Sequence, residues 1–289
     1  MLIRLGYDIR FDLPAPTALV ALLHVHPSRE PDLREPDKLL TEPKIPVAEY
    51  IDSFGNRCSR LFAPAGELRL YGSTMIVGVD EPDEIDLGAQ ELPVQDLPHE
   101  VLQFLLSSRY CEVDRLSAVA LDLFGGMPPG FSRVQAVVGY VNRIVQFGYQ
   151  HARPTKTALD VYTERTGVCR DFQHLAITLC RALNIPARYA TGYLGDFGVP
   201  LSPSPMDFSA WFEVYLSGRW WTMDARHNCQ RLGRVLMATG RDASDVALTT
   251  SFGTANLTHF SVVSDWLDEQ AKSGSSGPTH MAATGGRHE

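Results

Sequence analysis

Apolar and polar side chains alternate strictly at the start of the chain. Ile3, Leu5, Tyr7, Ile9, Phe11 and Leu13 are separated by charged residues or glycine. A period of two over this length predicts a β-strand with one buried face. Residues 49–64 predict a hairpin that turns near 54–56, and residues 66–80 predict one or two more strands. We therefore expect a small β-sandwich in the N-terminal part.

Apolar residues take up helical spacing after the glycine- and proline-rich stretch at 125–132. We predict helices that begin at Ser132, Thr157 and Cys169, the third ending near Asn184. Strands are predicted to follow over residues 187–194, 209–216 and 219–226. Ser217-Gly218 has the length and composition of a two-residue hairpin turn between the last two strands.

These patterns predict an α+β protein in three parts. Residues 1–125 form a β-rich domain with a linker, and residues 126–266 form a core of helices on an antiparallel sheet. Within that core, residues 231–265 read as mixed loop and strand. Residues 267–289 are rich in Gly, Ser, Thr and Ala, which predicts a disordered tail.

Composition and charge narrow the class of protein. The chain of 289 residues contains 26 Lys and Arg and 34 Asp and Glu, which gives a net charge of −8. We therefore expect no nucleic-acid partner and no membrane partner. No apolar stretch approaches the roughly 18 residues that span a bilayer, and the charged N-terminus does not resemble a signal peptide. The five cysteines are scattered and form no C-x-x-C pair, which indicates a reduced, cytoplasmic protein without a zinc site.

Cys169 is the candidate with the clearest chemistry. It follows Gly167 closely and begins a predicted helix, where free N–H groups and the helix dipole favour a thiolate and lower the cysteine pKa. The same N–H groups suit a developing oxyanion. The alternative is a buried structural cysteine, which spacing alone does not exclude.

Two segments around this cysteine carry a family resemblance. GVCRDFQHLAITLCRALNIPARYATGY (167–193) resembles the cysteine motif of the transglutaminase-like superfamily, which includes bacterial candidate cysteine proteases. WFEVYLSGRWWTMDARHN (211–228) is similar to the second and third catalytic motifs of that superfamily. The resemblance covers roughly residues 1–265. It implies an N-terminal β-sandwich followed by a papain- or transglutaminase-like core.

The resemblance also implies roles for individual residues. It makes Cys169 the nucleophile that attacks an amide or ester carbonyl and forms an acyl-enzyme, and Asp224 the residue that orients a histidine. The family's histidine falls two residues before Trp211. This chain has Ser209 there, and a serine hydroxyl is too short and cannot act as the base at neutral pH.

The predicted hairpin explains why position 209 matters. If Ser217-Gly218 is the turn, Leu216 faces Arg219, and Asp224 falls opposite Trp211. Position 209 is then a diagonal neighbour of Asp224 on one face of the sheet. A histidine at 209 would contact Asp224, whereas Ser209 provides no imidazole for this carboxylate to orient.

Three other histidines are candidate substitutes for the missing base. His227 lies three residues after Asp224, on the opposite face if the strand continues, but a bend or bulge at the strand end would bring it back. His174 lies about 140° around the helix from Cys169, which is poor placement. His151 lies in a loop, and its position is open. For each of the three, a structural or surface role is the alternative.

The sequence leaves competing functions open. One is a cysteine peptidase or amidase acting on peptide or isopeptide bonds of a protein or peptide substrate. Another is a catalytically reduced relative that uses the same groove as a peptide-binding or scaffold module, which Ser209 favours. Amine transfer differs from hydrolysis only in the acyl acceptor. No glycine-rich phosphate loop and no metal-ligand cluster is recognisable, so we expect no cofactor and no metal.

Overall fold

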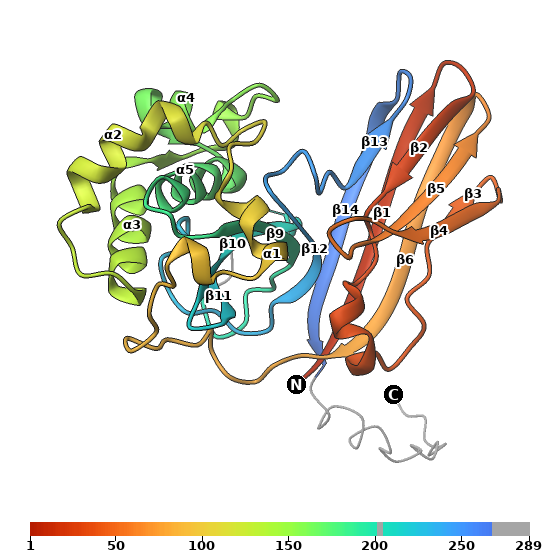
Figure 1. Cartoon of the computed structure of the whole chain (residues 1–289). Helices are drawn as coiled ribbons and strands as arrows, with labels where there is room; N and C mark the ends of the chain where they lie inside the picture. Colours follow the sequence, from red (N-terminus) through yellow and green to blue (C-terminus); the bar gives the residue numbers. More distant parts are fainter. Residues whose placement is uncertain (201–204, 268–289) are drawn as a thin grey trace, which may run out of the picture.

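The computed structural model describes residues 1–200 and 205–267 of the chain. A β-sandwich lies beside a unit in which helices pack on a separate antiparallel sheet (Figure 1). The predicted α+β class is confirmed. The predicted tail, 267–289, lies outside the described residues except for Leu267, which is the last residue of a strand.

Two four-stranded sheets form the sandwich. Their strand orders are β14-β1-β6-β3 and β13-β2-β5-β4. Alternate residues of β1 such as Ile3, Leu5 and Ile9 are buried, which confirms the predicted strand with one buried face. The hairpin predicted over residues 49–64 is formed by β4 and β5. The strands are β1 (Leu2–Leu13), β2 (Thr17–Ala21), β3 (Leu40–Glu42), β4 (Val47–Ile51), β5 (Arg57–Ala63), β6 (Gly66–Val77), β13 (Thr249–Ser251) and β14 (Asn256–Leu267).

The end of the described chain returns to the sandwich. β14 pairs antiparallel with β1 over almost its whole length, and β13 pairs with β2. In Figure 1 these strands, in blue, lie against the red strands of the N-terminus. The sequence pattern places residues 231–265 in the core as mixed loop and strand. The pairing of β13 and β14 instead joins residues 249–267 to the sheets of the N-terminal strands.

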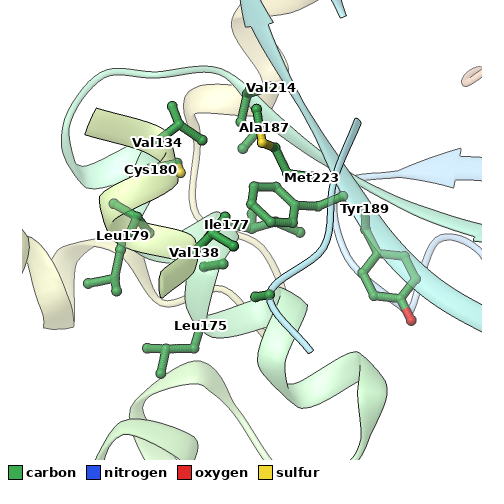
Figure 2. Packing of buried hydrophobic residues seen from close by; sticks show 14 of the residues in the cluster. Val134, Val138, Leu175, Ile177, Leu179, Cys180, Ala187, Tyr189, Val214 and Met223 are labelled. Carbon is green, nitrogen blue, oxygen red and sulfur yellow. The ribbon is translucent and has the colours of Figure 1, made fainter. Parts of the chain in front are cut away.

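The second unit places helices on the sheet β11-β10-β9-β12. Three helices pack against a central one, α5. Figure 2 shows the buried side chains of α5 and α3 together with those of the sheet. Its elements are α2 (Val113–Phe124), α3 (Phe131–Ile144), α4 (Ala158–Glu164), α5 (Cys169–Ala182), β9 (Ala187–Tyr193), β10 (Ser209–Leu216), β11 (Arg219–Met223) and β12 (Val235–Gly240). Shorter elements are α1 (His99–Leu102), β7 (Gln146–Phe147) and β8 (Thr166–Gly167).

The helix starts follow the sequence closely, with two differences. Thr157 caps α4, because its side chain accepts from the Asp160 N–H while the Asp160 carboxylate accepts from the Thr157 N–H. Cys169 is the first residue of α5, as predicted. The helix predicted from Ser132 begins at Phe131 and is preceded by Gly130, whose φ of 124° only glycine adopts easily. Helix α2 lies in the segment that the sequence pattern assigns to the linker, and that pattern does not predict it.

One hydrophobic cluster joins the sandwich to the second unit. It contains Leu5 and Tyr7 of β1, Val262 of β14, and Tyr193 and Met237 of the other sheet. The two units therefore share apolar packing at the side of the sheet that carries β9 and β12. No helix in the described residues is both long enough and apolar enough to cross a membrane.

Candidate active site

The hairpin of β10 and β11 has the predicted register. Leu216 faces Arg219 and Phe212 faces Met223, while Ser217 and Gly218 form the turn with φ values of 47° and 82°. Two positive φ values are what a tight two-residue hairpin turn requires. Strand β11 ends at Met223, so the residue that follows, Asp224, leaves the ladder at the edge of the sheet.

A tight turn after β11 brings His227 back to Asp224. The Asn228 N–H donates to the Asp224 carbonyl oxygen at 2.9 Å, and the His227 N–H donates to Asp224 Oδ1 at 3.1 Å. His227 Nδ1 lies 2.8 Å from Asp224 Oδ2. The bend that we considered at the strand end is therefore present, and His227 meets the carboxylate that the family resemblance assigns to a histidine at 209.

Two further buried side chains hold Asp224. Gln173 Nε2 donates to Asp224 Oδ1 at 3.2 Å, and Arg234 Nη2 donates to Asp224 Oδ2 at 2.9 Å. Burial opposes ionisation of Asp224, but the hydrogen bond from His227 and the charge of Arg234 outweigh it and hold its pKa well below the usual range. The ionised Asp224 carboxylate accepts a hydrogen bond from His227 Nδ1–H. In a neutral His227 the lone pair is then on Nε2, which can accept a proton.

Sequence reasoning missed both Gln173 and Arg234. Gln173 lies four residues after Cys169 in α5, so it projects from the same side of the helix one turn further on. That spacing was a usable signal. Arg234 lies beyond β11 in a segment without periodicity. Its Nε also donates to the Asp83 carboxylate at 3.0 Å. The two residues are 151 positions apart, so no local sequence pattern predicts this contact.

Cys169, Ser209 and His227 line one cavity of about 360 Å³, which we call the Cys169 cavity. Asp224 lies behind it and is 6% exposed. Residues from five parts of the chain complete its wall: Tyr149, Leu194, Asp196, Pro205, Met206, Asp207, Phe208, Arg226, Arg231, Val262, Val263, Ser264 and Asp265. The fold therefore brings the predicted nucleophile, the candidate base and the family's histidine position to one space.

The helix start positions Cys169 but does not make its thiol acidic. The Asp171 carboxylate is buried and accepts from the Val168 N–H at 2.9 Å, which fixes the entry into α5. Burial raises the pKa of the Cys169 thiol to about 11, although Arg226 and the Arg170 N–H lower it. The expectation of a lowered cysteine pKa was wrong, because desolvation outweighs the helix start.

The other two candidate histidines, His174 and His151, do not line this cavity. His174 is fully buried, stacks on Tyr110 and accepts from the Ala243 N–H at 3.1 Å. Burial lowers its pKa, so it is a neutral packed residue. His151, which we expected in a loop, is the last residue of a short 3-10 helix (Tyr149–His151), and its Nε2 is 3.2 Å from Gln150 Nε2. Of the described histidines, only His227 lines the Cys169 cavity.

The other four thiols do not line the Cys169 cavity. Cys58, Cys111 and Cys180 are buried, Cys229 is exposed, and all five cysteines are free. Burial raises the pKa of Cys58 and of Cys111 to about 11. In residues 1–200 and 205–267 no three His, Cys, Asp or Glu side chains gather in a way that could hold a metal ion.

Comparisons with known proteins identify the family. The model of the transglutaminase-like superfamily matches residues 117–225, which run from within α2 to just past Asp224. The crystal structure of a candidate cysteine protease from Cytophaga hutchinsonii is 32% identical, covers 93% of this chain and 91% of its own, and superposes with a TM-score of 0.80. The chain belongs to the transglutaminase-like superfamily.

Two further matches are more limited. An uncharacterized protein of Mycobacterium leprae is 31% identical over 94 residues, which is 32% of this chain and about a third (33%) of that protein. The periplasmic domain of TgpA from Pseudomonas aeruginosa is 18% identical, covers 78% of this chain and 90% of its own, and gives a TM-score of 0.39.

Proposed function

We propose that the protein is a cysteine peptidase or amidase that cleaves amide bonds of a protein or peptide through Cys169. The observation that carries the proposal is the 2.8 Å contact between His227 Nδ1 and Asp224 Oδ2, beside a cavity that His227 shares with Cys169. Membership of the transglutaminase-like superfamily agrees with this chemistry. In this proposal His227 takes the role of the histidine that the resemblance expects at Ser209.

The proposed cycle has two halves. His227 Nε2 accepts the thiol proton while Sγ of Cys169 bonds to the carbonyl carbon, and the charge on the carbonyl oxygen is stabilised by N–H groups at the start of α5. The C–N bond then breaks, and the amine leaves with the proton from His227. Water next attacks the thioester, gives a proton to His227, and releases the carboxylic acid as the thiol is restored. An amine in place of this water would give transfer instead of hydrolysis.

A high thiol pKa fits this order of events. A thiol with a pKa of about 11 is almost fully protonated at neutral pH, so the proton must leave as the nucleophile attacks. General-base assistance of this kind requires a neutral histidine within reach. We therefore assign His227 a role in the attack itself and not in a preformed thiolate–imidazolium pair.

A second candidate function is a peptide-binding relative that has lost catalysis. Two observations favour it: Ser209 occupies the position of the family's histidine, and burial raises the pKa of Cys169. In that case the Cys169 cavity binds a peptide and His227 supports Asp224 only.

Combined variants separate the two functions. We expect Cys169→Ala and His227→Ala each to abolish hydrolysis of a permissive ester or peptide substrate. Ser209→His alone should add little, because His227 already serves. In the His227→Ala background, Ser209→His should restore part of the rate, because position 209 and Asp224 are near one another in the hairpin. Hydrolysis that is the same in the parent protein and in Cys169→Ala would contradict the proposal.

A further inference from the structure

Part of the wall of the Cys169 cavity comes from the sandwich. Four consecutive residues of β14, from Val262 to Asp265, line it. Side chains of consecutive residues in a strand point to opposite faces. A cavity that touches four in a row therefore runs along the edge of the strand. β14 is the outermost strand of its sheet, with β1 on one side and, within the described residues, no strand on the other.

The hydrogen bonds at the start of β1 show which way its main chain faces. Leu2 faces Val77 in the pairing of β1 with β6, and the Gly78 N–H donates to the Met1 carbonyl at 2.8 Å. Residues of an antiparallel strand present N–H and C=O to alternate sides. Odd-numbered residues of β1 therefore bond to β6, and even-numbered ones bond to β14.

The same alternation shows which residues of β14 direct their N–H and C=O groups toward β1 and which direct them toward the open edge. Gly6 faces Val263 and Arg4 faces Asp265. Val263 and Asp265 therefore bond to β1. Val262 and Ser264 present their N–H and C=O groups to the open edge, where they meet the Cys169 cavity.

Two buried polar atoms beside this edge have no hydrogen-bond partner among residues 1–200 and 205–267. Ser264 is 8% exposed and its Oγ is unpartnered, and Arg231 is 5% exposed with an unpartnered Nε. Both residues line the Cys169 cavity. A buried donor or acceptor without a partner is unfavourable, so these atoms point to a polar occupant of the cavity.

We propose that the substrate binds as an extended peptide that adds a strand to the free edge of β14, with main-chain hydrogen bonds to Val262 and Ser264. Strand addition of this kind recognises the peptide backbone and leaves side-chain preference to pockets. The docked strand would run directly past Cys169 and His227, because the edge of β14 and these residues line one cavity. The inference rests on the proposed function for its substrate class, and assigns the sandwich a part in substrate binding.

A binding measurement tests the inference without catalysis. The protein carries Cys169→Ala, and the probe is fluorescein-labelled, reduced and carboxymethylated α-lactalbumin, a permanently unfolded chain. We expect Ser264→Pro, which removes one outward N–H and no bond to β1, to raise the Kd by roughly five- to tenfold. An unchanged Kd, or no binding of the probe to the Cys169→Ala protein, would overturn the proposal.

Ile51→Pro is the matched control. β4 is the edge strand of the second sheet, and the Asp52 N–H donates to the Asn56 carbonyl at 3.0 Å, so the neighbouring Ile51 N–H points outward. Ile51 is 58% exposed and does not line the Cys169 cavity. Its proline variant should leave the Kd unchanged. An equal loss of binding in both proline variants would overturn the proposal.

Amide exchange gives a readout that needs no proline. In the Cys169→Ala protein, the Val262 and Ser264 amides should exchange faster than those of Val263 and Asp265. Bound probe should slow exchange at Val262 and Ser264, and the absence of added protection there would overturn the proposal. A protein that binds the probe in this way but does not hydrolyse it would retain the strand inference and lose the proposed hydrolase function.

Discussion

Gln173 lies one helical turn after Cys169, and its side-chain N–H donates to Asp224 Oδ1 at 3.2 Å. The same amide group donates to the Ala210 carbonyl at 3.2 Å and accepts from the Ala225 N–H at 3.1 Å. One buried side chain thus connects the helix of the nucleophile to β10 and to the residues that follow β11. The distance between Cys169 and the Asp224–His227 pair depends on this connection.

Replacing Gln173 by methionine should therefore affect both stability and turnover. Gln173→Met keeps the volume but leaves the Ala225 N–H and the Ala210 carbonyl unpaired, which costs about 2 kcal/mol in the free energy of unfolding. We expect kcat to fall while KM changes little, because Asp224 and His227 lose a positioning contact. Urea unfolding and steady-state kinetics measure the two effects. The exposed glutamine variant Gln95→Met is the control, and a Gln173→Met protein with normal kcat would speak against the positioning role.

Arg234 should be a large contributor to folding because it neutralises two carboxylates. Its guanidinium contacts Asp224 at 2.9 Å and Asp83 at 3.0 Å, and its side chain is 8% exposed. Arg234→Met removes the cation and leaves both carboxylates facing a buried space, so we expect a loss of about 3 kcal/mol in urea unfolding. Adding Asp83→Asn to Arg234→Met should recover part of this loss. Independent, additive effects of the two substitutions would mean that the pair is not coupled.

The alkylation rate of Cys169 should follow the high pKa of its thiol. In a Cys229→Ser protein, which lacks the exposed cysteine, Cys169 is the one partly exposed thiol. Because burial raises its pKa to about 11, the thiolate fraction rises about tenfold per pH unit between pH 7 and 9. Iodoacetamide labelling followed by mass spectrometry should show this slope. A plateau near neutral pH would indicate a preformed thiolate.

His174 should make the protein less stable in mild acid. Burial lowers its pKa in the folded state, whereas in the unfolded chain it titrates near its ordinary value of about 6.5. As the pH falls below that value, His174 binds a proton in the unfolded chain but stays neutral in the folded protein. The free energy of unfolding therefore decreases by up to about 1.4 kcal/mol per pH unit. His174→Gln should flatten this dependence, and the exposed-site control His99→Gln should not. Equal slopes in all three proteins would contradict the assignment.

Local patterns predicted the parts of the site that short-range geometry determines. The turn at Ser217-Gly218 sets the register that places Asp224 at the end of β11, and the apolar spacing after Cys169 sets α5. The return of His227 depends on the chain leaving the strand immediately after Met223, which strand periodicity does not reveal. The pairing of β14 with β1 joins residues about 260 positions apart, and such pairing is determined by packing of the whole chain.

The acylation rate of Cys169 in a His227→Gln protein tests the central claim most directly. The measurement is the initial release of p-nitrophenol from p-nitrophenyl acetate, with the rate of Cys169→Ala subtracted as background. If His227 accepts the thiol proton, the rate should fall by about 10²–10⁴-fold, which is the usual contribution of a positioned base. A His227→Gln protein that is acylated as fast as the parent would contradict the account, because the Cys169 thiol would then lose its proton to a group other than His227.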